Sequence, residues 1–292
     1  MGLLARRAGI IRRDDGPLLV RIIVNLTLPA LIFLILEGAT LDASLLLVPV
    51  AGFAIHFILL GLGWVATRVW GMERPRAGAL IVATAVGNTG FFGLPLIAAS
   101  GSGFSLPAAV MYDAFATGLI TWTSTVAVAT AYGRPDGHPR VPVREVARHL
   151  ANAPNAALVA GVTVNLLGVG DLPDMISRPF EILGAATLPL TMLYAGIMIE
   201  VRGLSRLWGE MTYAVVVRLG LSALLGVAIA SLFRFSGDVF NTIVIMAAMP
   251  TAMMSLVIGA RSGLRSDVLA GAVVVTTVLA TLTLPMWRAA LL

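Results

Sequence analysis

Hydrophobic and polar positions divide this chain into long apolar blocks separated by short polar turns. A helix needs about 20 predominantly apolar residues to cross the hydrocarbon core of a bilayer. The blocks therefore predict an all-α integral membrane protein with about nine transmembrane helices. The predicted segments are Leu18–Leu36, Ser44–Trp70, Ala77–Ser100, Leu106–Tyr132, Asn155–Val169, Ile176–Glu200, Met211–Phe233, Thr242–Ala260 and Val268–Leu291.

Glycine and proline interrupt the third of these segments. Residues 84–96 read TAVGNTGFFGLPL, with Gly87, Gly90, Gly93 and Pro95 crowded into the middle. Proline removes a backbone donor and glycine resists helical geometry least, so a break in the helix is predicted here. In hydrocarbon, such a break survives only where it is buried in protein or lines a water-filled cavity. The break therefore indicates a site.

Composition supports the membrane class. The 292 residues are 58% hydrophobic and 12% charged, whereas roughly 25% of an average soluble domain is charged. Mean hydropathy is +0.94. Cysteine is absent, which excludes a disulfide framework and thiolate metal sites. The net charge of +5 is spread through short loops, so it indicates topology and not a nucleic-acid partner.

All 20 basic residues are arginine, and they cluster in alternate loops. Groups of arginines precede the first segment and follow the second, fourth, sixth and eighth. Because short cytoplasmic loops carry the Lys/Arg excess, this alternation predicts a cytoplasmic N-terminus and an external C-terminus. The longest basic loop, 133–152, is predicted to be a cytoplasmic linker between a first repeat, 1–132, and a second, 153–292.

Short matches between the two halves support a repeat. Thr27–Leu31 reads TLPAL and Thr187–Thr191 reads TLPLT, while Pro95 is matched by Pro250. The members of each pair are five segments apart. Five is odd, so the partners face opposite ways across the membrane, which is the inverted-topology arrangement of secondary transporters.

The string Asn88–Leu96, NTGFFGLPL, resembles the signature of the auxin efflux carrier family, which includes the plant PIN-FORMED carriers and bacterial permeases for malate and malonate. The resemblance implies a ten-helix transporter of two inverted five-helix repeats. It also implies that the fourth and ninth helices break at prolines, here Pro95 and Pro250, and cross at the substrate site.

The family places an apolar helix before a basic segment that residues 2–11 resemble. This sequence begins at that segment. Either the first helix has been lost, or the coding region extends upstream of Met1, where we expect a further apolar helix.

The two breaks predict where a substrate binds. The second half of a broken helix presents free N–H groups and a positive dipole end, which suit an anion such as a carboxylate. The predicted substrate-binding residues are Asn88, Thr89, Gly90, Pro95, Pro250 and Thr251.

Asp113 and Arg218 lie well inside predicted segments, where charge is costly and suggests function. Asp113 is either a protonatable or cation-coupling group, or a structural residue capped by hydroxyls or paired with arginine. Arg218 either attracts an anionic substrate, or snorkels towards the cytoplasm or pairs with Asp113. The lone His56 is interpreted as a packing residue.

These features predict a secondary active or potential-driven transporter of small organic anions that works by alternating access. The alternative is a membrane receptor or sensor that binds a small carboxylate without moving it. The chain lacks paired intramembrane carboxylates, an HExxH motif and a Walker A motif, so no enzyme, metal or cofactor is expected. A proton or sodium ion is the candidate coupling ion, a homodimer the candidate assembly, and the bacterial inner membrane the expected location.

Overall fold

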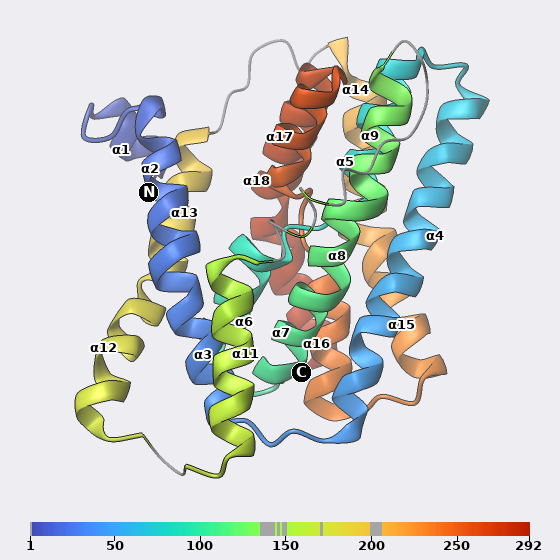
Figure 1. Ribbon diagram of the computed structural model, residues 1–292. Coiled ribbons are helices and arrows are strands. Elements are labelled where there is room, and N and C mark those ends of the chain that lie inside the picture. The colour runs from blue at the N-terminus through green and yellow to red at the C-terminus, as the bar shows by residue number, and fades with distance from the viewer. Residues whose placement is uncertain (1, 135–143, 145–146, 148–150, 170–171, 199–205) are drawn as a thin grey trace.

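The computed structural model describes residues 2–134, 144, 147, 151–169, 172–198 and 206–292, and these residues form helices (Figure 1). The α-helices are α1 (Gly2–Arg7), α2 (Gly16–Ile22), α3 (Leu28–Glu37), α4 (Val48–Val69), α5 (Arg74–Ala85), α6 (Leu94–Ala99), α7 (Leu106–Met111), α8 (Gly118–Ile120), α9 (Val126–Gly133), α11 (Ala153–Leu166), α12 (Asp174–Ala185), α13 (Thr187–Met198), α14 (Trp208–Val215), α15 (Ser222–Leu232), α16 (Gly237–Ala247), α17 (Met253–Ser262) and α18 (Ser266–Leu291).

Each of the nine predicted segments falls on one continuous helical rod or on an interrupted pair of helices, which confirms the all-α membrane fold. Short 3₁₀ or π-helical turns extend several rods. In the described part of the chain, the helices long and apolar enough to cross a membrane are Gly16–Glu37, Ser44–Val69, Leu106–Gly133, Asp174–Ile197, Trp208–Leu232 and Ser266–Leu291. The remaining segments are the two interrupted ones and the shorter α11.

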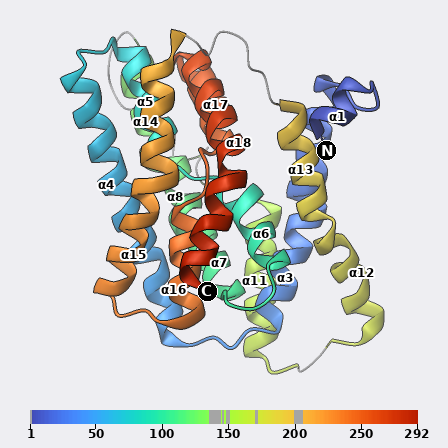
Figure 2. The ribbon, with the colours of Figure 1, turned by 180° about the vertical axis from the view of Figure 1, so that it is seen from behind.

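The helices form two bundles that stand side by side (Figures 1 and 2). In the first bundle α3 packs against α11 and α12, and α13 packs against α1 and α2. The second bundle holds α4, α5 and α14 to α18 together with the rods of α6 to α9. The bundles touch where α13 meets α6 and where α3 meets α7.

Two interrupted helices cross within the second bundle. The chain leaves helical geometry between α5 and the π-helical turn η4 (Thr89–Gly93), and again between α16 and α17. The extended residues pair as an antiparallel bridge between Gly87 and Thr251. Asn88 N–H donates to the Pro250 carbonyl at 2.7 Å, and Ala252 N–H donates to the Val86 carbonyl at 2.9 Å. Each break thus supplies partners for backbone groups that the other break frees, which hydrocarbon could not do.

The first break lies upstream of where the glycine pattern suggested. The glycines at 90 and 93 and Pro95 lie within the helical rod that starts at η4, and the break falls at residues 86–88. The reason lies in Pro95, one turn into the same rod. A helix-interior proline lacks an N–H and clashes with the preceding turn, and the wider π turn relieves both problems. The same pairing occurs in the first bundle, where the π-helical turn η2 (Ile23–Thr27) precedes Pro29.

The loops that follow α4 and α17 lie at one end of the molecule, the upper end in Figure 1, and the C-terminus lies at the other end. There Arg76 pairs with Glu210, and the Arg74 guanidinium donates to the Ala131 carbonyl. Arg265 N–H donates to the Pro75 carbonyl at 3.2 Å. This gathering agrees with the alternation predicted from the loops; that the end is cytoplasmic remains a prediction. Most of the 133–152 linker lies outside the described residues, and the repeat boundaries remain a prediction.

Candidate functional site

A cavity of about 260 Å³ lies beside the crossing of the two broken helices. We call it the crossover cavity. Its polar lining comes from the first break, from the rod of α7 to α9, and from Asn152 and Asn155 at the start of α11, and its apolar lining comes from both bundles. The lining residues that matter here are Asn88, Thr89, Gly90, Phe91, Asp113, Thr117, Trp122 and Met254.

Unused hydrogen-bond donors lie beside this cavity at the start of the Thr89–Ala99 helix. The Asn88 side chain is only 3% exposed, and its amide nitrogen has no partner among the described residues. The N–H groups of the first residues of a helix have no intrahelical acceptor, and Thr89, Gly90 and Phe91 occupy those positions. A buried amide and a helix N-terminus therefore supply donors next to the cavity.

A carboxylate lies beside these donors. Asp113, in the π-helical turn η5 (Tyr112–Thr117), accepts a hydrogen bond from Thr89 Oγ1 at 2.5 Å. Its other oxygen lies so close to Gly90 that a Cβ there would sit 2.9 Å from it, which explains the glycine. In the described part of the chain Asp113 forms no ion pair. The crossover cavity thus combines free donors with one unneutralised acid.

Arg218, in the π-helical turn η8 (Val216–Leu221), lies on the opposite side of the crossing and is buried. Its guanidinium donates to the Met249 carbonyl at 2.7 Å and to the Ala247 carbonyl at 3.0 Å, and Ser222 Oγ donates to the Ala247 carbonyl at 2.8 Å. A cation at a helix C-terminus offsets the negative end of the helix dipole. Arg218 therefore caps the broken end of α16. It neither snorkels nor pairs with Asp113.

His56 of α4 caps the broken end of the other helix, α5. Its Nδ1 donates to the Ala85 carbonyl at 2.9 Å, at the end of α5, and its Nε2 lies 3.1 Å from Ser124 Oγ. A satisfied packing role was the interpretation of His56, and it did not specify that the partner would be the broken end of α5. The signal available was positional, since His56 and Arg218 are the polar residues midway along the rods that precede the two breaks.

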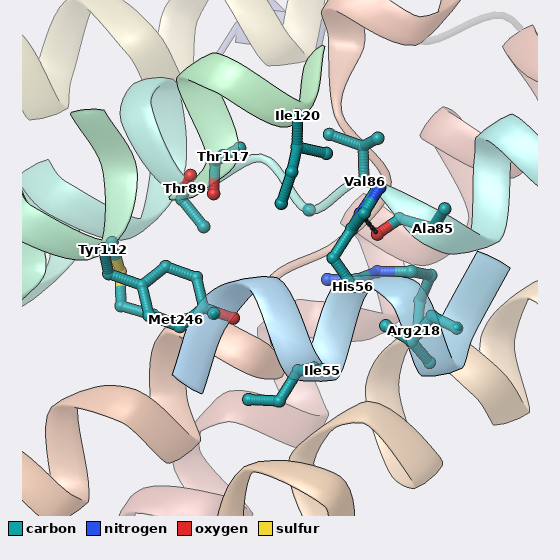
Figure 3. A pocket seen from close by; sticks show the side chains of 13 residues that line it. Ile55, His56, Ala85, Val86, Thr89, Tyr112, Thr117, Ile120, Arg218 and Met246 are labelled. Carbon is teal, nitrogen blue, oxygen red and sulfur yellow. Dashed lines mark hydrogen bonds between the residues drawn. The ribbon is translucent and has the colours of Figure 1, made fainter. Parts of the chain in front are cut away.

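His56 and Arg218 also line a small cavity of about 20 Å³ behind the crossing, together with Tyr112, Thr89 and Thr117 (Figure 3). That volume accommodates about one water molecule. Thr89 and Thr117 line both cavities, so they form the wall between them.

The structure separates the predicted site residues into two groups. Asn88, Thr89 and Gly90 line the crossover cavity together with Asp113, whereas Pro95, Pro250 and Thr251 do not. Thr251 is fully buried, and its hydroxyl donates to the Ala83 carbonyl at 2.8 Å. These three residues shape or hold the crossing, and none of their side chains faces the space where a ligand would fit.

A larger cavity of about 900 Å³, which we call the vestibule, lies between the bundles at the arginine-bearing end. Residues of α2 and α13 line one side, and residues of α17 line the other. It shares Phe91, Trp122 and Met254 with the crossover cavity, so the two spaces adjoin. The described residues contain no cluster of three potential metal ligands.

Membrane-length helices, together with two broken helices that cross beside a cavity with polar groups, define the architecture of a multi-pass membrane transporter. The family model described as "Membrane transport protein" matches residues 1–133 and 138–288. The chain therefore belongs to this family, which confirms the resemblance to auxin efflux carriers carried by Asn88–Leu96.

Named relatives agree with this class. The chain is 28% identical over 294 residues to an uncharacterized transporter of Methanothermobacter thermautotrophicus, an alignment that covers 100% of this chain and 94% of the relative. It is 24% identical over 301 residues to an uncharacterized transporter of Methanocaldococcus jannaschii, covering 98% and 93%. It is 27% identical over 269 residues to a candidate malonate transporter of Rhizobium meliloti, covering 89% and 82%.

Proposed function

We propose that this transporter carries small organic anions, and that the crossover cavity holds the substrate carboxylate. The observation that carries the proposal is the unpartnered, buried amide of Asn88 beside the free N–H groups of Thr89–Phe91. A carboxylate accepts hydrogen bonds from all of these donors at once. The name of the Rhizobium meliloti relative supports an acid of this kind.

Asp113 then requires a positive partner when the anion is bound. Two unit charges of the same sign about 4 Å apart repel by about 4 kcal/mol at an effective dielectric constant of about 20. In the described part of the chain no cation neutralises Asp113. We therefore propose that a proton binds Asp113 together with the substrate, so that anion and proton move as one unit. A sodium ion at the same carboxylate is the second candidate.

Alternating access fits the arrangement of cavities. The vestibule gives the crossover cavity a route to the arginine-bearing end. The membrane potential of a negative-inside cell favours export only of a substrate that stays negative after one proton has bound, such as a dicarboxylate. The state described here is thus open towards the predicted cytoplasm. The bacterial inner membrane and a homodimer remain predictions.

Counterflow in proteoliposomes tests this function against the alternative of a sensor. Vesicles preloaded with one monocarboxylate or dicarboxylate are given the labelled acid outside, at two pH values. A carrier accumulates label transiently, and a proton-coupled carrier does so faster at the lower pH. Saturable binding of the same acids with no accumulation of label would instead establish a receptor.

A further inference from the structure

The vestibule is lined by two arginines, one from each bundle. Arg21 belongs to the last turn of α2, and Arg261 belongs to the last turn of α17. Both are exposed, and neither side chain forms a hydrogen bond or ion pair within the described structure. Other arginines at this end are engaged: Arg76 with Glu210, and Arg265 with Asp267. Arg21 and Arg261 are therefore available to a ligand.

Between these arginines the vestibule is apolar and aromatic. Phe91, Trp122, Tyr194 and Met253 lie along its wall. Phe91 and Trp122 also line the crossover cavity, so a molecule leaving the vestibule inwards passes between them. One acid, Asp14, lines the same space and offsets part of the positive charge.

We propose that the vestibule is an outer binding station, at which a carboxylate with an apolar body pauses before it enters the crossover cavity. The carboxylate pairs with Arg21 and Arg261, and the apolar body lies on Phe91, Trp122 and Tyr194. This inference rests on the proposed function. It assigns the arginines a role distinct from that of Asn88 and Asp113, because they recruit the anion and do not hold it during translocation.

The chemistry of the station makes its binding weak and fast. Solvent-exposed ion pairs contribute little affinity, and their main effect is to raise the local concentration of the anion and its rate of entry. Salt screens such charges over about 10 Å at 0.1 M ionic strength. The arginines should therefore lower the KM for substrate that enters from this end, and leave kcat unchanged.

The test compares Arg21→Gln, Arg261→Gln and their double variant with the parent protein in membrane vesicles of both orientations. The double variant should raise KM by about three- to tenfold at low ionic strength when substrate enters from the arginine-bearing end. The increase should shrink at high salt, and KM from the opposite side should stay unchanged. Lysine at both positions should restore the parent KM, and Asp14→Asn should lower it.

Arg68→Gln is the matched control, because Arg68 is exposed at the same end but stacks over Trp64 outside the vestibule. The outer station is overturned if the double variant behaves like Arg68→Gln, or if its KM rises equally from both sides at every salt concentration. Either result leaves the proposed function intact as long as the parent transports carboxylates. A parent protein that moves no carboxylate overturns both.

Discussion

Asn88 is the side chain on which the proposed carboxylate binding depends most. Its amide nitrogen is buried without a partner, so a ligand that accepts its hydrogen bond relieves an existing cost. Thr89 differs, because its hydroxyl already donates to Asp113. The two neighbours therefore have different proposed roles: Asn88 binds the substrate, and Thr89 positions the Asp113 carboxylate.

Asn88→Ala should weaken substrate binding by about 1.5–3 kcal/mol, or one to two decades of affinity, because it removes one hydrogen bond to a charged ligand. Equilibrium binding of labelled acid to purified protein measures this, and size-exclusion chromatography checks the fold. Asn25→Ala is the control, since Asn25 is exposed and its amide donates to the Arg21 carbonyl. Equal affinities in the parent protein and Asn88→Ala would remove the substrate from the crossover cavity.

Asp113→Asn should make transport insensitive to pH. In the parent protein the rate should fall as pH rises, because the ionised Asp113 carboxylate repels the bound anion, whereas the amide stays neutral throughout. Asparagine can still accept the hydrogen bond from Thr89, so binding and folding should persist. Initial transport rates of the parent protein and Asp113→Asn between pH 5 and 8 test this prediction. A pH profile that is the same in both proteins would assign Asp113 a structural role only.

At the scale of elements, the two broken helices are capped in the same way at their broken C-terminal ends. A buried basic side chain from the preceding rod caps each broken end: His56 caps α5, and Arg218 caps α16. We propose that these residues are equivalent positions of the two inverted repeats, 1–132 and 153–292. The equivalence agrees with the matches of Pro29 to Pro189 and of Pro95 to Pro250.

Arg218→Met should destabilise the protein and not merely weaken binding. It leaves the Met249 carbonyl without its donor, and an unsatisfied buried polar group costs about 1–3 kcal/mol. The Ala247 carbonyl keeps Ser222. Thermal unfolding in detergent should show a lower midpoint than that of Asn88→Ala. An unchanged midpoint would mean that the cap contributes nothing to stability.

Pro95→Ala should slow transport while the protein stays folded. Without the proline, η4 can close into ordinary α-helix, and this turns Thr89 and Gly90 relative to Asp113. Pro75→Ala is the control, because Pro75 occupies the first turn of α5, where no helical donor is lost. Counterflow rates at saturating substrate measure the effect. Parent-like rates in Pro95→Ala would show that the π turn does not depend on its proline.

At the scale of the whole molecule, the arginine-bearing end should face the cytoplasm. The absence of cysteine makes labelling of introduced thiols free of background. An impermeant thiol reagent applied to intact cells should label Leu292→Cys and spare Gly137→Cys, and both should react after the membrane is opened. Labelling of Gly137→Cys in intact cells would reverse the topology and place the vestibule outside.

Local sequence signals predicted the segments and the two breaks, whereas long-range contacts decided the site. Gly87 and Pro95 predict an interruption because glycine and proline weaken the helix in which they themselves stand. The partners of Thr251 and Arg218 are backbone carbonyls in other rods, which become acceptors only once those helices break. No pattern of residue types indicates such acceptors. The sequence therefore placed Thr251 among the substrate-binding residues and, for Arg218, offered only attraction of an anion, snorkelling or pairing with Asp113.

The crossing itself is joined by main-chain atoms, through Asn88 N–H to the Pro250 carbonyl and Ala252 N–H to the Val86 carbonyl. Every amino acid except proline supplies these atoms, so a change of side chain at residue 88 leaves the joint intact. Ligand preference can then drift by substitution at that position while the scaffold persists. Residue 88 joins the crossing through its main chain alone, so at this position a change in ligand preference is separated from a change in stability.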